Sequence, residues 1–198
     1  DALVEMGNTY LAEQALFDYR LVSTLGLTDD DVSAFSALPG VRTAVGSITE
    51  DVLFDAAGGA NQVVRIHSVT DGVNLPDLQA GRMPAAANEC LLDARHVDQS
   101  VLGTTLKISE ENGESQLDAV TVSEFTVVGL IQSPYYLNNQ RGTTALGTGT
   151  VDRFIYVLPE AFQQDYFTEV FIILEDTQET KIYSEAYGRA AGAMEAPL

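Results

Sequence analysis

The stretch FDYRLVSTLGLTDDDVSAFSALPGV, residues 17–41, decides how the chain begins to fold. Residues 17–21 alternate apolar and polar side chains, which is typical of a half-buried strand. We therefore expect Phe17, Tyr19 and Leu21 to share one face of a strand.

A helix is predicted directly after this strand. Thr28 is a favourable N-cap residue, and Asp31, three positions later, completes a capping box. The consecutive carboxylates of residues 29–31 also suit the positive end of the helix dipole. Pro39-Gly40 is expected to end the helix. Between these signals runs an apolar stripe, made of Val32, Phe35 and Leu38.

The next segments indicate a β-α-β unit followed by a segment of short strands and turns. Residues 41–54 are predicted to form one or two strands and residues 62–67 another, so a strand, a helix and a strand follow one another. Residues 72–123 hold several Gly and Pro residues between short strand-like runs at 89–92 and 104–108. This pattern is typical of a small, mostly β subdomain.

The last third returns to a mixed pattern. Residues 120–131, 154–158 and 168–174 favour strands, and residues 133–150 favour a long loop rich in Asn, Gly and Thr. Apolar side chains at helical spacing predict a helix over 182–194. The expected fold class is therefore α+β, a β-α-β body with an inserted β-rich part.

Charge separates this chain from several classes of protein. It has 29 acidic against 10 basic residues, a formal net charge of −19 over 198 residues. Such a field repels nucleic-acid phosphates and anionic lipid headgroups, so neither is an expected partner. No apolar run of the sequence is long enough to span a bilayer.

No residue carries a recognisable catalytic, cofactor-binding or metal-binding pattern. The single cysteine, Cys90, precedes two leucines and suits a buried core position. His67 and His96 lack a second ligand at metal-site spacing. The three aspartates at 29–31 are better explained by capping than by calcium, and the glycine-rich run 142–149 lacks the Gly-Lys-Ser/Thr of a phosphate loop. We expect no enzymatic activity.

Three groups of residues, in order along the chain, resemble a known family. The first is the strand and acidic helix described above, followed by Leu38-Pro39-Gly40-Val41. The second is LQAGRMP at 78–84 followed by ECLL at 89–92, and the third is LGTTLKI at 102–108 followed by FTVVGLI at 125–131. Together they resemble the extracytoplasmic core domain of FtsX-like and MacB-like ABC-transporter permeases. The loop at 135–150 and the acid excess depart from the general family pattern.

This resemblance implies both an architecture and a role. Residues 1–71 and 150–198 would form a porter-like subdomain, and residues 72–149 an inserted, β-rich Sabre-like subdomain. The chain begins at Asp1 without a methionine, and we interpret it as an excised piece whose ends continue into membrane helices. The domain would lie on the extracytoplasmic face of the cell membrane and would move when a cognate ABC ATPase subunit hydrolyses ATP in the cytoplasm.

The predicted partners follow from the same resemblance. They are the protein's own transmembrane helices, the ATPase subunit, and either a second permease copy or an extracytoplasmic protein. Three residues of the long loop, Tyr135, Tyr136 and Arg141, are the predicted partner contacts, although the aromatic pair also suits a loop anchor. The alternative reading is a free secreted module that binds a cation, glycan or peptide.

Overall fold

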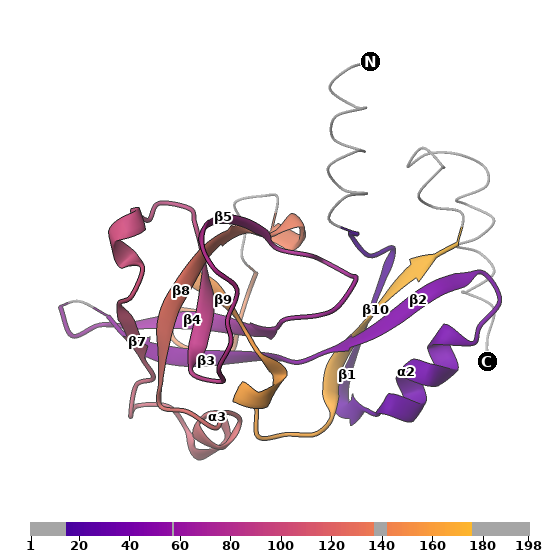
Figure 1. Ribbon diagram of the computed structural model, residues 1–198. Coiled ribbons are helices and arrows are strands. Elements are labelled where there is room, and N and C mark those ends of the chain that lie inside the picture. Colours follow the sequence, from indigo (N-terminus) through magenta and orange to yellow (C-terminus); the bar gives the residue numbers. More distant parts are fainter. Residues whose placement is uncertain (1–14, 57, 137–141, 176–198) are drawn as a thin grey trace. The chain divides into compact units, whose positions relative to one another are not determined.

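The computed structural model describes residues 15–56, 58–136 and 142–175 (Figure 1). Strands dominate it and helices are few and short, so the predicted α+β class is confirmed. The chain forms two compact units. The first contains the residues up to Gly46, then Thr70–Leu75, and the residues from Phe167 onward, and the second contains Ser47–Val69 and Pro76–Tyr166.

The first unit holds a three-stranded sheet in which the last strand of the described chain lies in the middle. β10 (Phe167–Leu174) separates β1 (Tyr19–Leu27) from β2 (Val41–Ser47). β1 runs antiparallel to β10, with Tyr19 opposite Ile172. The predicted β-α-β unit is therefore present as β1, α2 (Asp29–Ser36) and β2, but its two strands are not neighbours.

Helix α2 forms as the sequence predicts. The Thr28 hydroxyl accepts from the Asp31 amide, and the Thr28 amide donates to Asp31 Oδ2 at 2.8 Å, which completes the capping box. The helix ends at Ser36, with Ala37 as its C-cap. Its apolar stripe packs on the cluster formed by Val41, Ala44, Val170, Ile172 and Leu174. Burial of this stripe fixes the helix on the sheet.

A buried carboxylate lies on β10. Glu169 is 1% exposed, and its Oε2 accepts from Arg20 Nε on β1 at 2.5 Å. Because Glu169 is opposite Val22 and Arg20 is opposite Phe171, the two side chains form a diagonal cross-strand pair. The arginine compensates for the lost hydration of the carboxylate and ties β1 to β10.

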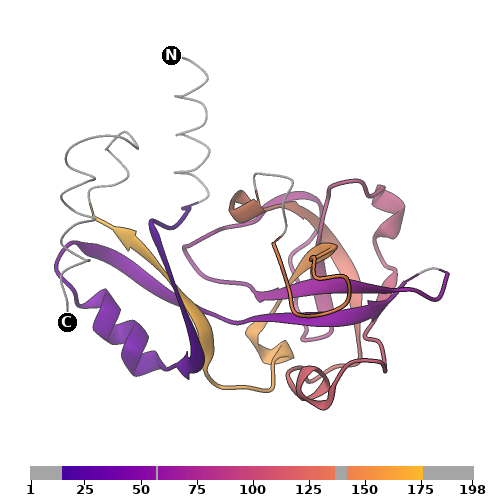
Figure 2. The same cartoon turned by 180° about the vertical axis from the view of Figure 1, so that it is seen from behind.

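The second unit is built on a seven-stranded mixed sheet (Figures 1 and 2). The strand order is β3-β4-β9-β6-β8-β5, with β7 also paired to β8. The β4–β9 and β6–β8 pairs are parallel and the other pairs are antiparallel. The strands are β3 (Thr49–Asp55), β4 (Asn61–Ser68), β5 (Asp77–Gly81), β6 (Glu89–Asp93), β7 (Thr105–Lys107), β8 (Glu124–Gln132) and β9 (Arg153–Val157).

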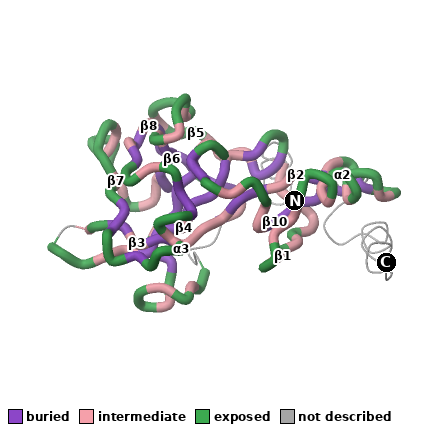
Figure 3. The backbone as a smooth tube through the Cα atoms, turned by 90° about the horizontal axis from the view of Figure 1, so that it is seen from below, coloured by how far each residue is buried: buried purple, intermediate pink, exposed green. Residues whose placement is uncertain are grey.

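The core of the second unit lies along these strands, where the buried segments of Figure 3 gather. Phe125, Val127 and Ile131 on β8 are fully buried, as is Leu91 on β6. Short helices occupy the connections. They are η1 (Gln99–Val101), α3 (Glu114–Asp118), η2 (Pro134–Tyr136) and η3 (Pro159–Ala161).

The boundaries of the two compact units differ from those of the predicted subdomains. The sequence predicts residues 1–71 and 150–198 as one subdomain, whereas residues 47–69 and 150–166 belong to the second unit. The reason is hydrogen bonding, because β3, β4 and β9 are paired into the seven-stranded sheet. The predicted helix at 182–194 lies outside the described residues.

No helix within the described ranges is both long and apolar enough to cross a bilayer.

Candidate functional site

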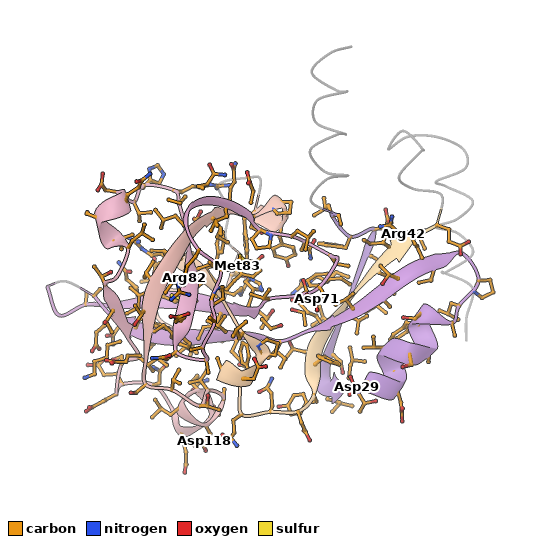
Figure 4. All side chains as sticks on the ribbon, viewed as in Figure 1. Asp29, Arg42, Asp71, Arg82, Met83 and Asp118 are labelled. Carbon is orange, nitrogen blue, oxygen red and sulfur yellow. The ribbon has the colours of Figure 1, made fainter. Side chains whose placement is uncertain are left out.

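The loop that joins β5 to β6 is held by one arginine–glutamate pair. Arg82 Nη1 donates to Glu89 Oε2 at 2.8 Å and Arg82 Nη2 donates to Glu89 Oε1 at 2.5 Å. Glu89 Oε2 also accepts from the Ala85 amide at 2.7 Å, and Arg82 Nη1 reaches the Met83 carbonyl at 3.0 Å. Figure 4 shows Arg82 and Met83 side by side on this loop. We call this set the Arg82–Glu89 clamp.

The electrostatics of the clamp keep it ionised over a wide pH range. The Arg82 guanidinium, followed by the Ala85 amide, lowers the pKa of Glu89 to about 2. The hydrogen bonds that Arg82 donates to Glu89 raise the pKa of Arg82. The paired arrangement is bidentate, which fixes the orientation of both side chains.

Two glycines bring the start of the clamp against β8. Gly81 and Gly129 are opposite each other in the β5–β8 register. Gly81 has φ +80, and a Cβ there would overlap the Val128 carbonyl oxygen. A Cβ on Gly129 would lie 2.5 Å from the Arg82 carbonyl oxygen and 3.0 Å from Leu78 Cδ1. Glycine is thus required at both positions by the close approach of the two backbones.

A second arginine holds a different loop to the same sheet. Arg65 Nε and Nη2 donate to the two oxygens of Asp51 at 2.7 and 2.8 Å, and Nη2 also donates to the Thr143 carbonyl at 3.0 Å. The hydrogen bond to Asp51 raises the pKa of Arg65. Gly142 lies against this side chain, since a Cβ there would be 2.9 Å from Arg65 Nη1. We call this set the Arg65–Asp51 clamp.

Beside the Arg65–Asp51 clamp lies a buried aromatic cluster, which we call the Tyr136 cluster. The Tyr136 ring stacks on Phe154 at 4.0 Å, and its hydroxyl shares a 2.6 Å hydrogen bond with His67 Nε2. The other ring nitrogen of His67 bonds to Thr49 Oγ1 at 3.1 Å. Burial raises the pKa of Tyr136. The members of the cluster are His67, Tyr135, Tyr136, Phe154 and Tyr156.

The predicted partner contacts fall in different places. Tyr136 is 4% exposed, a position that suits a loop anchor, and its contact role stays a prediction. Tyr135 is half-buried against the rings of Tyr136 and His67, and its contact role stays a prediction. Arg141 lies outside the described residues.

The other residues considered in the sequence, Cys90, Asp31, His67 and His96, lie in different surroundings. Cys90 is fully buried, and burial raises the pKa of its thiol to about 12. The Thr28 amide lowers the pKa of Asp31, as expected of a capping carboxylate. His67 lies in the Tyr136 cluster, whereas His96 is exposed with φ +59. Within the described part of the chain, no group of three or more His, Cys, Asp or Glu side chains could hold a metal ion.

Glu50 is a half-buried carboxyl group whose pKa is raised. Loss of hydration raises the pKa of Glu50 on β3, while its neighbour Asp51 is bound to Arg65. A hydrolase that used a pair of carboxylates would need a second free acid facing Glu50. Asp51, held by both oxygens, does not supply it.

Sequence reasoning did not single out the Arg82–Glu89 clamp. Both residues lie in the motif segments at 78–84 and 89–92, but they are seven positions apart and no helix or turn periodicity joins them. Residues 77–81 carry no strand pattern, so no local signal shows that Arg82 follows one strand and that Glu89 begins the next. Such a pair can close a loop if the two strands lie near each other.

Comparison with known proteins gives matches at the level of structure alone. No family model and no curated protein matches the chain. The extracellular domain of the noncanonic ABC-type transporter YknZ from Gram-positive bacteria is 13% identical, with 89% of this chain and 88% of that chain covered and a TM-score of 0.48. The periplasmic region of MacB from Actinobacillus actinomycetemcomitans is 10% identical, with 89% and 75% covered and a TM-score of 0.45.

A third structure is a permease-protein domain from Porphyromonas gingivalis, 14% identical, with 86% of this chain and 76% of that chain covered and a TM-score of 0.39. At identities of 10–14%, these three likenesses concern the fold alone.

Proposed function

We propose that this chain is the extracytoplasmic domain of a bacterial ABC-transporter permease. One observation supports it above all. The family-like segments occur in order, and two of them meet in the fold, since Gly81 of the second segment is opposite Gly129 of the third. The glycines of both segments are therefore explained by one close backbone approach rather than by chance composition.

In this proposal the domain acts as a relay that breaks no bonds. Its own transmembrane helices and a cognate ABC ATPase subunit would supply the movement, and the domain would carry it to a substrate or partner outside the cell. A relay needs stiff elements, and the seven-stranded sheet has a densely buried centre on β6, β8 and β9. Two carboxylates of this sheet, Asp51 and Glu89, are each bound to an arginine, which suits a structural role in such a relay.

Membrane location can be tested with one engineered cysteine. Asp118 is exposed on α3 (Figure 4), and Cys90, the one cysteine of the 198 residues, is fully buried, so this domain adds little background with thiol reagents. The Asp118→Cys variant is expressed from the complete gene, and intact cells are treated with a membrane-impermeant maleimide. In the membrane fraction of intact cells, we expect labelling of Asp118→Cys above the level of wild type.

Two outcomes would overturn the proposal. Labelling only after cell lysis would place the domain in the cytoplasm. Labelled protein in the culture medium would favour the alternative, a free secreted binding module. The complete gene gives an independent check, because the proposal requires membrane-spanning segments beside this domain and an ATPase partner.

A further inference from the structure

One exposed stretch of the second unit has a composition unlike the rest of the chain. Residues 78–88 contain no acidic residue, although the whole chain has 29. Every side chain here is exposed or half-exposed, and the large apolar ones, Leu78 and Met83, are 38% and 42% exposed. The single charge, on Arg82, is balanced by Glu89. Depletion of charge together with exposed Met and Arg is typical of interface cores, and exposed apolar side chains add to this.

This stretch includes a strand with an open side. β5 is hydrogen-bonded to β8 and ends the sheet, and no strand of the described chain pairs with its other side. Proteins usually protect such edges with charged side chains. The charge within β5 is Asp77 at its first residue, which accepts a 2.7 Å hydrogen bond from Gln79. A register shift between Leu78 and Ala80 interrupts the strand, so only a short length is available for pairing.

The apolar side chains are presented on a rigid support. Leu78 Cδ1 and the Arg82 carbonyl oxygen both lie within 3.0 Å of the position that a Cβ on Gly129 would take, so they lie over the same point of β8. From there the Arg82–Glu89 clamp fixes the Met83 carbonyl and the Ala85 amide. Order in the free protein lowers the entropy lost on binding.

We propose that the β5 edge, with Leu78 and Met83, is a docking surface for an extended segment of another protein. The segment adds a short strand to β5 and places alternate apolar side chains on Leu78 and Met83. It carries lysine or arginine, because the net charge of −19 attracts cations and opposes the approach of a second copy of this chain. This inference does not depend on the permease assignment.

The test uses the 198-residue domain labelled with ¹⁵N and a synthetic eight-residue peptide of alternating lysine and valine. NMR titration at moderate salt should give shift changes centred on residues 77–83. The double variant Leu78→Gln/Met83→Gln should bind at least about tenfold more weakly, as expected for loss of apolar contacts at an interface centre. The matched control Leu25→Gln/Leu117→Gln removes two other exposed leucines, 96% and 42% exposed, and should bind within about twofold of wild type.

Backbone pairing is tested with two more peptides. N-methylation of all valines blocks one edge of the peptide strand, and N-methylation of all lysines blocks the other, because alternate amides point to opposite sides. Strand addition requires that one of these peptides loses binding and that the other keeps it. Circular dichroism and thermal melting confirm that each protein variant is folded.

Three results would overturn the proposal. Shift changes spread over the acidic residues, with equal affinity for both double variants, would show simple charge attraction. Equal binding of both N-methylated peptides would exclude strand addition. Concentration-dependent dimers that are abolished by Leu78→Gln/Met83→Gln would make a second copy the occupant. None of these results depends on where the domain lies in the cell, so the docking surface and the permease assignment fail separately.

Discussion

The Arg82–Glu89 and Arg65–Asp51 clamps use the same contacts in different surroundings. In each, an arginine donates to both oxygens of a carboxylate and also to one backbone carbonyl, that of Met83 in the first and of Thr143 in the second. Around Arg65 the neighbouring aromatic side chains are buried. After Arg82 the next side chain, Met83, is 42% exposed.

An ion pair can therefore either stabilise packing or hold an exposed loop in a fixed shape. The Arg65–Asp51 clamp is four-fifths buried, with side chains 17% and 20% exposed, and it closes a loop over core strands. The Arg82 side chain is 55% exposed, so solvent screens the attraction and little folding energy depends on it. Its effect is to hold a loop in one shape.

The largest loss in the free energy of unfolding is expected for substitution of Tyr136. Tyr136→Ala removes a buried ring that stacks on Phe154 at 4.0 Å, and we expect a loss of about 3–5 kcal/mol in the free energy of unfolding. Tyr136→Phe keeps the ring and removes the hydroxyl bonded to His67, with an expected loss of about 1–3 kcal/mol. Urea denaturation followed by near-UV circular dichroism measures both. Equal losses for the two variants would contradict a packing role.

The next effect concerns the close approach of β5 and β8. Gly81 and Gly103 have nearly the same φ, +80 and +82, but a Cβ at Gly81 would meet Val128, whereas a Cβ at Gly103 would meet nothing within 4 Å. Gly103→Ala should cost about 1–2 kcal/mol from backbone strain alone. Gly81→Ala should cost about 1–3 kcal/mol more, because the strands must separate. Similar denaturation midpoints for the two variants would refute the close approach.

The two clamps are compared directly by removing each arginine. Arg65→Ala leaves Asp51 without its partner in a largely buried site, and we expect a loss of about 1–3 kcal/mol in unfolding free energy. Arg82→Ala should leave the melting temperature close to that of wild type, while hydrogen exchange at the Ala85 amide becomes faster. A large drop in melting temperature for Arg82→Ala would mean that the exposed clamp also stabilises the fold.

The smallest effect is the pH dependence of the Arg82–Glu89 clamp. The folded pKa of Glu89 is about 2, below the ordinary value of 4.5, so ionised Glu89 favours the folded state. This contribution is complete above about pH 4.5 and is lost as the pH falls towards 2. Carboxyl ¹³C NMR titration of the folded domain measures the pKa. In Arg82→Ala the pKa of Glu89 should rise towards its ordinary value, and an unchanged pKa would show that Arg82 is not its cause.

Local signals in the sequence were reliable where the physics is local. The capping box at Thr28 and the apolar stripe of α2 are confirmed, because caps and helical faces depend on residues three or four apart. The strands at 62–67, 89–92 and 168–174 are confirmed within one residue at most ends. Their β-branched and aromatic content suffices to predict them.

Features that depend on distant residues were missed. β5 is short, contains one large apolar residue and ends in a glycine, so neither its length nor its pattern marks a strand. The burial of Tyr136 depends on Phe154 and His67, which lie on separate strands. The pairing of Arg82 with Glu89 depends on β5 and β6 both flanking β8. No single stretch of the sequence determines the order of the strands in the sheet.

The central place of β10 sets an order of events during synthesis. A ribosome that has reached Tyr166 has already made β1, α2 and β2, but the strand that must separate β1 from β2 does not yet exist. The hydrophobic side of α2 then has only two of the five buried residues on which it packs, because Val170, Ile172 and Leu174 have not been made. β1, α2 and β2 therefore cannot complete their packing until β10 has been synthesised. Termination at Tyr166 would leave the first unit without β10, although every strand of the second unit would have been made.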